Sequence, residues 1–238
     1  MDAPPPIRQK WPRSKPRPAD ARPFGRLIQA APRACILTGL ILALALAGQV
    51  ALHELAAARL QSAAQALGRG VDQSESTVTR WLALCGRRCP AQADEGAAAA
   101  YAELAAAFPA RRERLLAQAE QTANLGLRRN PLSAEGWARL GMIRAARAGG
   151  RATPGVLRAL RQSYAAAPYH RGAAQWRVSF CAAHWDEVTP QLRLAALAEL
   201  AWLDTIDNGA AFAVRGRIED PFVRELFEIR LLARRQPR

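Results

Sequence analysis

The longest uninterrupted apolar stretch of the chain runs from Ala34 to Leu52 and contains no charged residue. Its nineteen residues, at about 1.5 Å per residue, are long enough to span the ~30 Å hydrocarbon layer of a membrane. The leucines, isoleucines and valine favour insertion by about 3 to 5 kcal/mol, partly offset by Thr38, Gln49 and the glycines. We therefore expect a transmembrane helix over residues 34–52.

Two other interpretations of this segment are open. A buried core helix has a similar composition, but an all-round apolar stretch of this length behind a basic, proline-rich segment is typical of a membrane anchor. A cleaved signal peptide could end at Ala47, where "ALALAG" provides an A-x-A site. Because the 33-residue leader and the apolar core are both long for a signal peptide, we favour an uncleaved anchor.

Residues 1–33 are basic and rich in proline, with eight lysine and arginine residues against two aspartates. This composition predicts a disordered tail. The positive-inside rule keeps such a tail in the cytoplasm, where its cations can contact anionic lipids of the inner membrane. Everything after Leu52 is then expected on the other side of the membrane. The composition, rich in alanine and with arginine in place of lysine, indicates a GC-rich bacterial genome, so that side is the periplasm.

The rest of the chain is rich in alanine, leucine and arginine and poor in β-branched and aromatic residues, which predicts an all-α protein. We expect a stalk helix over His53–Leu67, ended by Gly68 and Gly70, within a stalk-and-loop segment of residues 53–95. Residues 96–238 are expected to form one antiparallel helical domain.

Three helix starts share one device, a capping side chain followed by proline at the first helical position. They are Thr153-Pro154, Thr189-Pro190 and Asp220-Pro221. The apolar spacing between these starts predicts one buried face for each helix. The predicted faces consist of Val156, Leu157, Leu160 and Tyr164; of Trp176, Phe180 and His184; and of Phe222, Leu226, Ile229 and Ala233.

The segment "NPLSAEGWARLG" carries Trp137, Leu140 and Gly141 in the spacing W-x-x-L-G. This spacing resembles the first helix of a tetratricopeptide repeat, and the resemblance implies that Leu160 lies in the second helix and that Pro168 ends it. The spacing of 37 residues between Pro131 and Pro168 exceeds the usual repeat length of 34, and "AGGRATP" is the expected place of the insertion. An ordinary helical hairpin remains the alternative, since Arg144 stands where the family usually has an aromatic residue.

A second resemblance covers the segment "ALRQSYAAAPYHRGAAQWRVSFCAAHWDEVTPQLRLAALAELAWL". It is similar to the C-terminal part of membrane-anchored, repeat-containing proteins that accompany bacterial exopolysaccharide biosynthesis. The resemblance implies a non-catalytic role as a scaffold or adaptor in exopolysaccharide synthesis or export, with polysaccharide-assembly proteins as partners.

Two of the four cysteines, Cys85 and Cys89, form "CGRRC" at the expected end of a helix. Because disulfides persist in the periplasm, we expect them to form a local disulfide that stabilises the fold by about 2 kcal/mol. A thiol-redox centre is the alternative, and it would make the protein an assembly factor resembling those of cytochrome c maturation. Cys35 and Cys181 are expected to act as small hydrophobic residues.

The sequence predicts no catalytic residue, no metal site and no cofactor. It lacks a glycine-rich phosphate loop and the H-E-x-x-H and G-x-S-x-G motifs. Adjacent acids at Asp94-Glu95, Asp186-Glu187 and Glu219-Asp220 are expected to point in different directions. The residues after Leu52 contain 26 arginines against 18 acidic residues, a net charge of +8 that would suggest nucleic-acid binding in the cytoplasm. Outside the membrane it favours anionic glycans, lipid head groups or an acidic protein instead.

Overall fold

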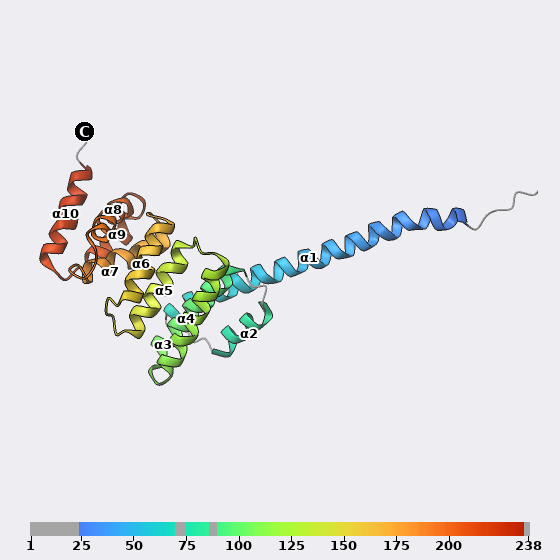
Figure 1. Ribbon diagram of the computed structural model, residues 1–238, viewed down its shortest axis with the longest axis horizontal. Coiled ribbons are helices and arrows are strands. Elements are labelled where there is room, and N and C mark those ends of the chain that lie inside the picture. The colour runs from blue at the N-terminus through green and yellow to red at the C-terminus, as the bar shows by residue number, and fades with distance from the viewer. Residues whose placement is uncertain (1–23, 70–74, 86–89, 236–238) are drawn as a thin grey trace, which may run out of the picture. The chain divides into compact units, whose positions relative to one another are not determined.

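The computed structural model describes residues 24–69, 75–85 and 90–235. Helices form all the regular secondary structure of these residues, as the composition predicts (Figure 1). The helices are α1 (Phe24–Gly68), α2 (Glu75–Cys85), α3 (Ala91–Ala107), a short 3-10 helix (Pro109–Arg111), α4 (Arg112–Arg129), α5 (Ala134–Arg147), α6 (Pro154–Ala166), α7 (Arg171–Ala183), α8 (Pro190–Ile206), α9 (Asn208–Arg215) and α10 (Pro221–Arg235). The chain divides into two compact units, one ending at Gly48 and one beginning at Gln49.

Helix α1 contains the predicted membrane segment. Its residues Thr38–Leu67 form a stretch that is long and apolar enough to cross a membrane. Large apolar side chains are exposed around the helix in this region, including Ile36, Leu44 and Leu52. The helix begins at Phe24, so its first turns fall within residues 1–33, which the composition assigns to a tail.

The second half of α1 has the opposite character, because one side of it is buried. Ala56, Ala57, Leu60 and Ala63 recur at helical spacing and are almost inaccessible to solvent. Leu60 faces α3, where Gly96 permits a close approach: a Cβ added there would lie 3.2 Å from the Leu60 Cβ and 3.1 Å from the backbone nitrogen of Gln61. The predicted end of this helix at Gly68 is confirmed.

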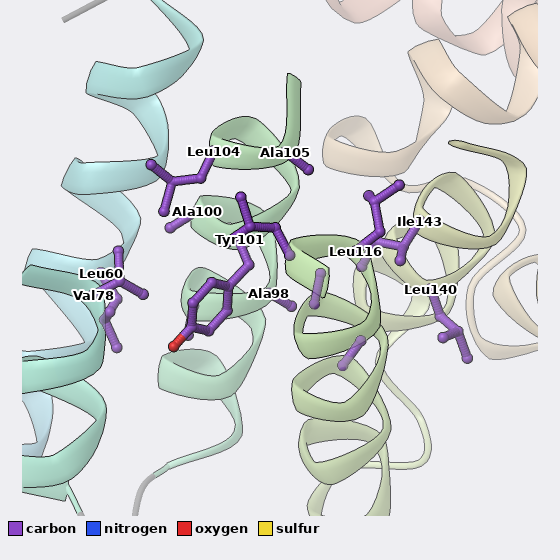
Figure 2. Packing of buried hydrophobic residues seen from close by; sticks show 14 of the residues in the cluster. Leu60, Val78, Ala98, Ala100, Tyr101, Leu104, Ala105, Leu116, Leu140 and Ile143 are labelled. Carbon is purple, nitrogen blue, oxygen red and sulfur yellow. The ribbon is translucent and has the colours of Figure 1, made fainter. Parts of the chain in front are cut away.

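The first of two buried cores joins the end of α1 with α2 to α5. Figure 2 shows Leu60 and Val78 on one side of α3, and Leu116 and Ile143 on the other. Alanines are frequent among the buried residues of α3 and α4, whose contact is the most extensive between the described helices. Small side chains let these two helices pack closely.

The second core is built on α5 to α10. Successive helices pack as the pairs α3 with α4, α5 with α6, and α7 with α8, while α5 also contacts α3, α4 and α7. The aromatic rings of Trp176 and Phe180 in α7 lie 5.2 Å apart, and Phe180 and His184 lie 4.4 Å apart. These three residues share one side of α7, as their spacing predicts.

All three predicted helix starts are confirmed. The hydroxyl of Thr153 accepts a hydrogen bond from the backbone N–H of Val156, and that of Thr189 accepts one from Leu192. The Asp220 carboxylate accepts two backbone N–H groups of the first turn of α10, at 2.8 and 3.1 Å. Each cap satisfies donors that have no partner within the helix.

The predicted buried face of α10 is wrong. Phe222 and Ile229, which that prediction buried, are 62% and 56% exposed. Val223, Phe227 and Leu231 are buried instead, and α10 packs on α8. The helix carries apolar residues on two sides, so spacing alone could not show which of them packs on the domain.

Candidate functional site

A cleft of about 590 Å³ lies between the segment after α7 and the segment before α10, and we call it the C-terminal cleft. Its size falls within the range of small-ligand sites. It is lined by Ala182, Ala183, His184, Trp185, Asp186, Glu187, Arg217, Glu219, Asp220 and Pro221. Helix α10 begins at Pro221 in the lining of the cleft, and α8 begins at Pro190, three residues after Glu187.

The wall of the cleft is held by interactions around His184 and Trp185. The Nδ1 atom of His184 lies 2.9 Å from the Glu187 carboxylate, which fixes the orientation of the imidazole ring. The indole of Trp185 packs edge-on against Phe227, at 5.9 Å between ring centroids. The Arg193 guanidinium lies 5.4 Å from the Trp185 ring centroid, within the range of a cation–π contact.

Four carboxyl groups line the cleft, from Asp186, Glu187, Glu219 and Asp220, against one arginine, Arg217. This corner is therefore acidic in a chain whose net charge is +14. Sequence reasoning treated the two pairs of adjacent acids as unrelated, and the structure brings them together. The available signal was their shared position beside a proline-started helix: Asp186 and Glu187 precede the cap Thr189, and Asp220 is itself the cap before Pro221.

A second concave site, of about 380 Å³, lies between α1, α3 and α5. Its polar lining includes Glu95, Glu103, Glu135 and Arg139. Burial raises the pKa of Glu95, and this outweighs the effects of hydrogen bonding and of nearby cations. Arg139 donates a hydrogen bond to Glu135 at 2.7 Å across one helical turn.

The third pair of adjacent acids separates as predicted. Asp94 is 4% exposed and forms a salt bridge with Arg129 of α4. Burial raises the pKa of Asp94, while Arg129 lowers it in part. Its neighbour Glu95 lines the second site instead. Asp94 therefore has a structural role in joining α3 to α4.

A buried ion pair in the second core was also not predicted from the sequence. Arg177 of α7 and Glu199 of α8 are both fully buried and form a two-point salt bridge, with Arg177 Nε donating to Glu199 at 3.0 Å. Arg177 also donates to the backbone carbonyl oxygens of Ser163 and Ala167, at 3.1 and 2.8 Å, where α6 ends. Its guanidinium lies 4.2 Å from the centroid of the Tyr164 ring.

The buried charges of Arg177 and Glu199 satisfy each other, so this ion pair has the arrangement of a structural element. Burial raises the pKa of Glu199, and the hydrogen bonds and charge of Arg177 partly counter that effect. Burial also raises the pKa of Tyr164 well above its ordinary value. None of the three groups lines either concave site described above.

The five residues of the repeat signature occupy defined places. Leu140 is buried in the first core and Leu160 in the second. Trp137 packs against the first core and donates its indole N–H to the Pro131 carbonyl oxygen at 2.8 Å. Pro168 directly follows the C-terminal cap of α6.

Gly141, the fifth residue, makes room for an aromatic ring. A Cβ added at this position would lie 2.4 Å from Cη2 of Trp176. The glycine therefore serves the contact between α5 and α7. Arg144, the departure from the repeat pattern, donates hydrogen bonds to Glu120 of α4 and to the Gly155 carbonyl oxygen of α6, at 2.8 and 3.3 Å.

Cys181 is fully buried, and burial raises the pKa of its thiol to about 12. It therefore fills space as a small hydrophobic residue, as the sequence predicts. The predicted disulfide between Cys85 and Cys89 lies outside the described residues, although α2 does end at Cys85. Among the residues that the structure describes, no group of three or more His, Cys, Asp or Glu side chains is placed to hold a metal ion.

Comparison with known proteins gave no match: no family model, no curated protein and no solved structure is similar to this chain.

Proposed function

We propose that this protein is a single-pass inner-membrane protein whose periplasmic helical domain is a non-catalytic docking platform for envelope assembly. The observation that carries the proposal is the exposed apolar surface of α1 from Ile36 to Leu55. Such a surface is unfavourable in water and favourable in lipid, where every backbone group of a helix is already paired. The eight basic residues of residues 1–33 support a cytoplasmic N-terminus.

The helix pairs of the second unit support a tetratricopeptide-like arrangement. In such a stack each pair contacts the next, as α5 does with α3, α4 and α7. Stacked helix pairs create extended binding surfaces, so docking of other proteins is the use that this architecture favours. Exposed apolar side chains on α8, α9 and α10, such as Leu194, Phe212 and Phe222, support the same use.

The assembly that we favour is exopolysaccharide synthesis or export, because the segment from Ala159 to Leu203 resembles the C-terminal part of membrane-anchored proteins that accompany exopolysaccharide biosynthesis. The test is recovery of the intact protein from membranes in mild detergent, followed by identification of the proteins that accompany it. Polymerase, transporter or glycosyltransferase subunits are expected. Recovery of haem-handling proteins would favour the cytochrome c maturation alternative, and recovery of neither would contradict both.

Topology is tested separately with two fusions at Arg238. A reporter that fluoresces only in the cytoplasm should stay dark, and a phosphatase that is active only in the periplasm should be active. The opposite pair of results would place the helical domain in the cytoplasm and exclude the proposed compartment.

A further inference from the structure

A third concave site, of about 310 Å³, lies between the last turns of α1 and the first turns of α2, and we call it the basic pocket. Its volume is at the lower end of the range for small-ligand sites. Two arginines, two hydroxyl side chains, an indole and a small side chain line it: Arg59, Arg69, Ser62, Thr77, Trp81 and Ala66. The described lining therefore carries two positive charges and no carboxyl group.

Helical spacing brings the α1 residues of the basic pocket to one face. Arg59, Ser62 and Ala66 follow one another at intervals of three and four residues, and Arg69 comes three residues after Ala66. The two arginines are ten residues apart in the sequence, which is about 15 Å along a helix axis. They therefore reach the pocket from opposite ends, and the short side chain of Ala66 leaves room between them.

Both arginines are available to a ligand. Arg59 and Arg69 are exposed, and neither forms a salt bridge with another residue that the structure describes. The carboxylate that begins α2, Glu75, is occupied by Arg111 and Arg114, whose nitrogens lie 3.6 and 2.8 Å from it. The end of α1 and the start of α2 add partial charges of opposite sign, each about half a unit charge. The two guanidinium groups therefore make the pocket positive.

We propose that the basic pocket binds the phosphate group of a phosphate ester between Arg59 and Arg69. A planar guanidinium group donates two parallel hydrogen bonds to phosphate or carboxylate oxygens. One arginine is enough for a carboxylate, whereas a phosphate group has oxygens for both arginines. Ser62 adds a hydroxyl group between them, and Trp81 gives the alcohol part of the ester an apolar wall.

A phosphate ester can come from the membrane or from solution. Arg59 follows Leu52, the end of the expected membrane segment, by seven residues, which is about 10 Å of helix. Arginine and tryptophan are also the residues that contact lipid head groups at a membrane surface. A phospholipid head group and a soluble ester share the same phosphate chemistry. The phosphate site does not depend on which proteins dock on the helical domain.

The first test titrates the full chain, washed free of lipid in an uncharged detergent at low salt, with glycerol 3-phosphate and follows binding by calorimetry. Saturable binding is expected. Arg59→Gln and Arg69→Gln should each raise Kd about tenfold, since each removes a charge-assisted contact. The matched control, Arg80→Gln, removes the same charge from an exposed position of α2 outside the pocket and should leave Kd unchanged. All three arginines are exposed, so helix content should stay the same.

Two further variants separate the shape of the pocket from its charge. Ala66→Leu keeps every charge but fills the space between the arginines, so it should abolish binding. Arg69→Lys keeps the charge but loses the two-point geometry, so it should weaken binding less than Arg69→Gln does. Glycerate, which has a carboxylate in place of the phosphate ester, should bind at least about tenfold more weakly than glycerol 3-phosphate.

The second test identifies the source of the phosphate. The full chain is placed in bilayer nanodiscs of phosphatidylcholine or of an uncharged glycolipid without phosphate, and glycerol 3-phosphate is titrated into both. A head group in the pocket competes with the soluble ester, so binding only in the glycolipid discs identifies the lipid as the ligand. Equal binding in both identifies a soluble ester.

Four results would each overturn the proposal. They are no saturable binding to the lipid-free chain, the same Kd for Arg59→Gln and Arg69→Gln as for Arg80→Gln, binding that survives Ala66→Leu, and glycerate binding as tight as that of glycerol 3-phosphate.

Discussion

Replacing Arg177 with methionine is expected to be among the most destabilising single changes in the second core. Methionine keeps much of the side-chain length but removes every donor that Arg177 offers. The Glu199 carboxylate then keeps one hydrogen bond, from the His170 backbone N–H at 3.4 Å. The carbonyl oxygens of Ser163 and Ala167 lose a donor as well.

The magnitude follows from burial. Removing one partner of a fully buried ion pair typically costs about 3 to 5 kcal/mol, because the remaining charge stays in a medium that solvates it poorly. Glu199 is 0% exposed, so solvent cannot take the place of Arg177. We therefore expect Arg177→Met to lower the free energy of unfolding by about 3 to 5 kcal/mol at pH 7.

The loss should depend on pH. Burial raises the pKa of Glu199, and without Arg177 that pKa must rise further. A raised pKa in the folded state means that the ionised form is penalised as pH rises through that pKa. The difference between wild type and Arg177→Met should therefore be largest at neutral pH and should shrink as pH falls and Glu199 becomes neutral.

The assay is urea unfolding of the full chain in mild detergent, followed by tryptophan fluorescence. Arg158→Met, an exposed change on α6, is the control and should alter stability by less than about 0.5 kcal/mol. The double variant Arg177→Met, Glu199→Leu should lose less than the sum of the two single changes. Additive losses, or a loss below about 1 kcal/mol for Arg177→Met, would refute the structural role of this pair.

Three further predictions follow from other contacts. Gly141→Ala should lower the free energy of unfolding by about 1 to 3 kcal/mol, because the new methyl group overlaps the Trp176 ring. The control Gly155→Ala should be neutral or stabilising, since its Cβ would meet nothing closer than 3.7 Å. Equal changes in the free energy of unfolding for the two variants would contradict this explanation. Burial alone would raise the pKa of Glu120, but hydrogen bonds from Arg144 and Arg147 hold it below its ordinary 4.5. Glu120→Gln should therefore destabilise by about 1 to 2 kcal/mol at pH 7. The difference from wild type should shrink as pH falls below 4.5, and a loss that stays constant down to about pH 3 would exclude an ionic contribution. Alkylation at pH 8 should leave Cys181 unmodified until the chain is denatured, since its pKa is about 12, and labelling of the folded protein, detected by mass spectrometry, would show that the second core opens readily.

The all-helical fold and several helix boundaries could be predicted from the sequence because they depend on local chemistry. Thr153, Thr189 and Asp220 satisfy N–H groups only three residues away, so a short window of sequence contains the whole interaction. The apolar character of residues 34–52 is equally local, since it needs only a count of side chains.

The C-terminal cleft and the buried ion pair depend on contacts between distant parts of the chain. Arg177 and Glu199 are 22 residues apart, and each looks like an ordinary charged helix residue until α7 packs on α8. The error in α10 has a related cause. Phe222 and Val223 are neighbours with similar hydrophobicity, and only the docking of α10 on α8 determines which of them is buried.

The alanine-rich packing around α3 limits how the sequence of this domain can change. Ala93, Ala97, Ala98 and Ala100 in α3 are 0% exposed, so a larger residue at any of them would have to push a neighbouring helix away. Exposed arginines elsewhere can be exchanged with little cost. Distant relatives of this chain should therefore preserve the spacing of short side chains along α3 while their large hydrophobic and charged residues diverge.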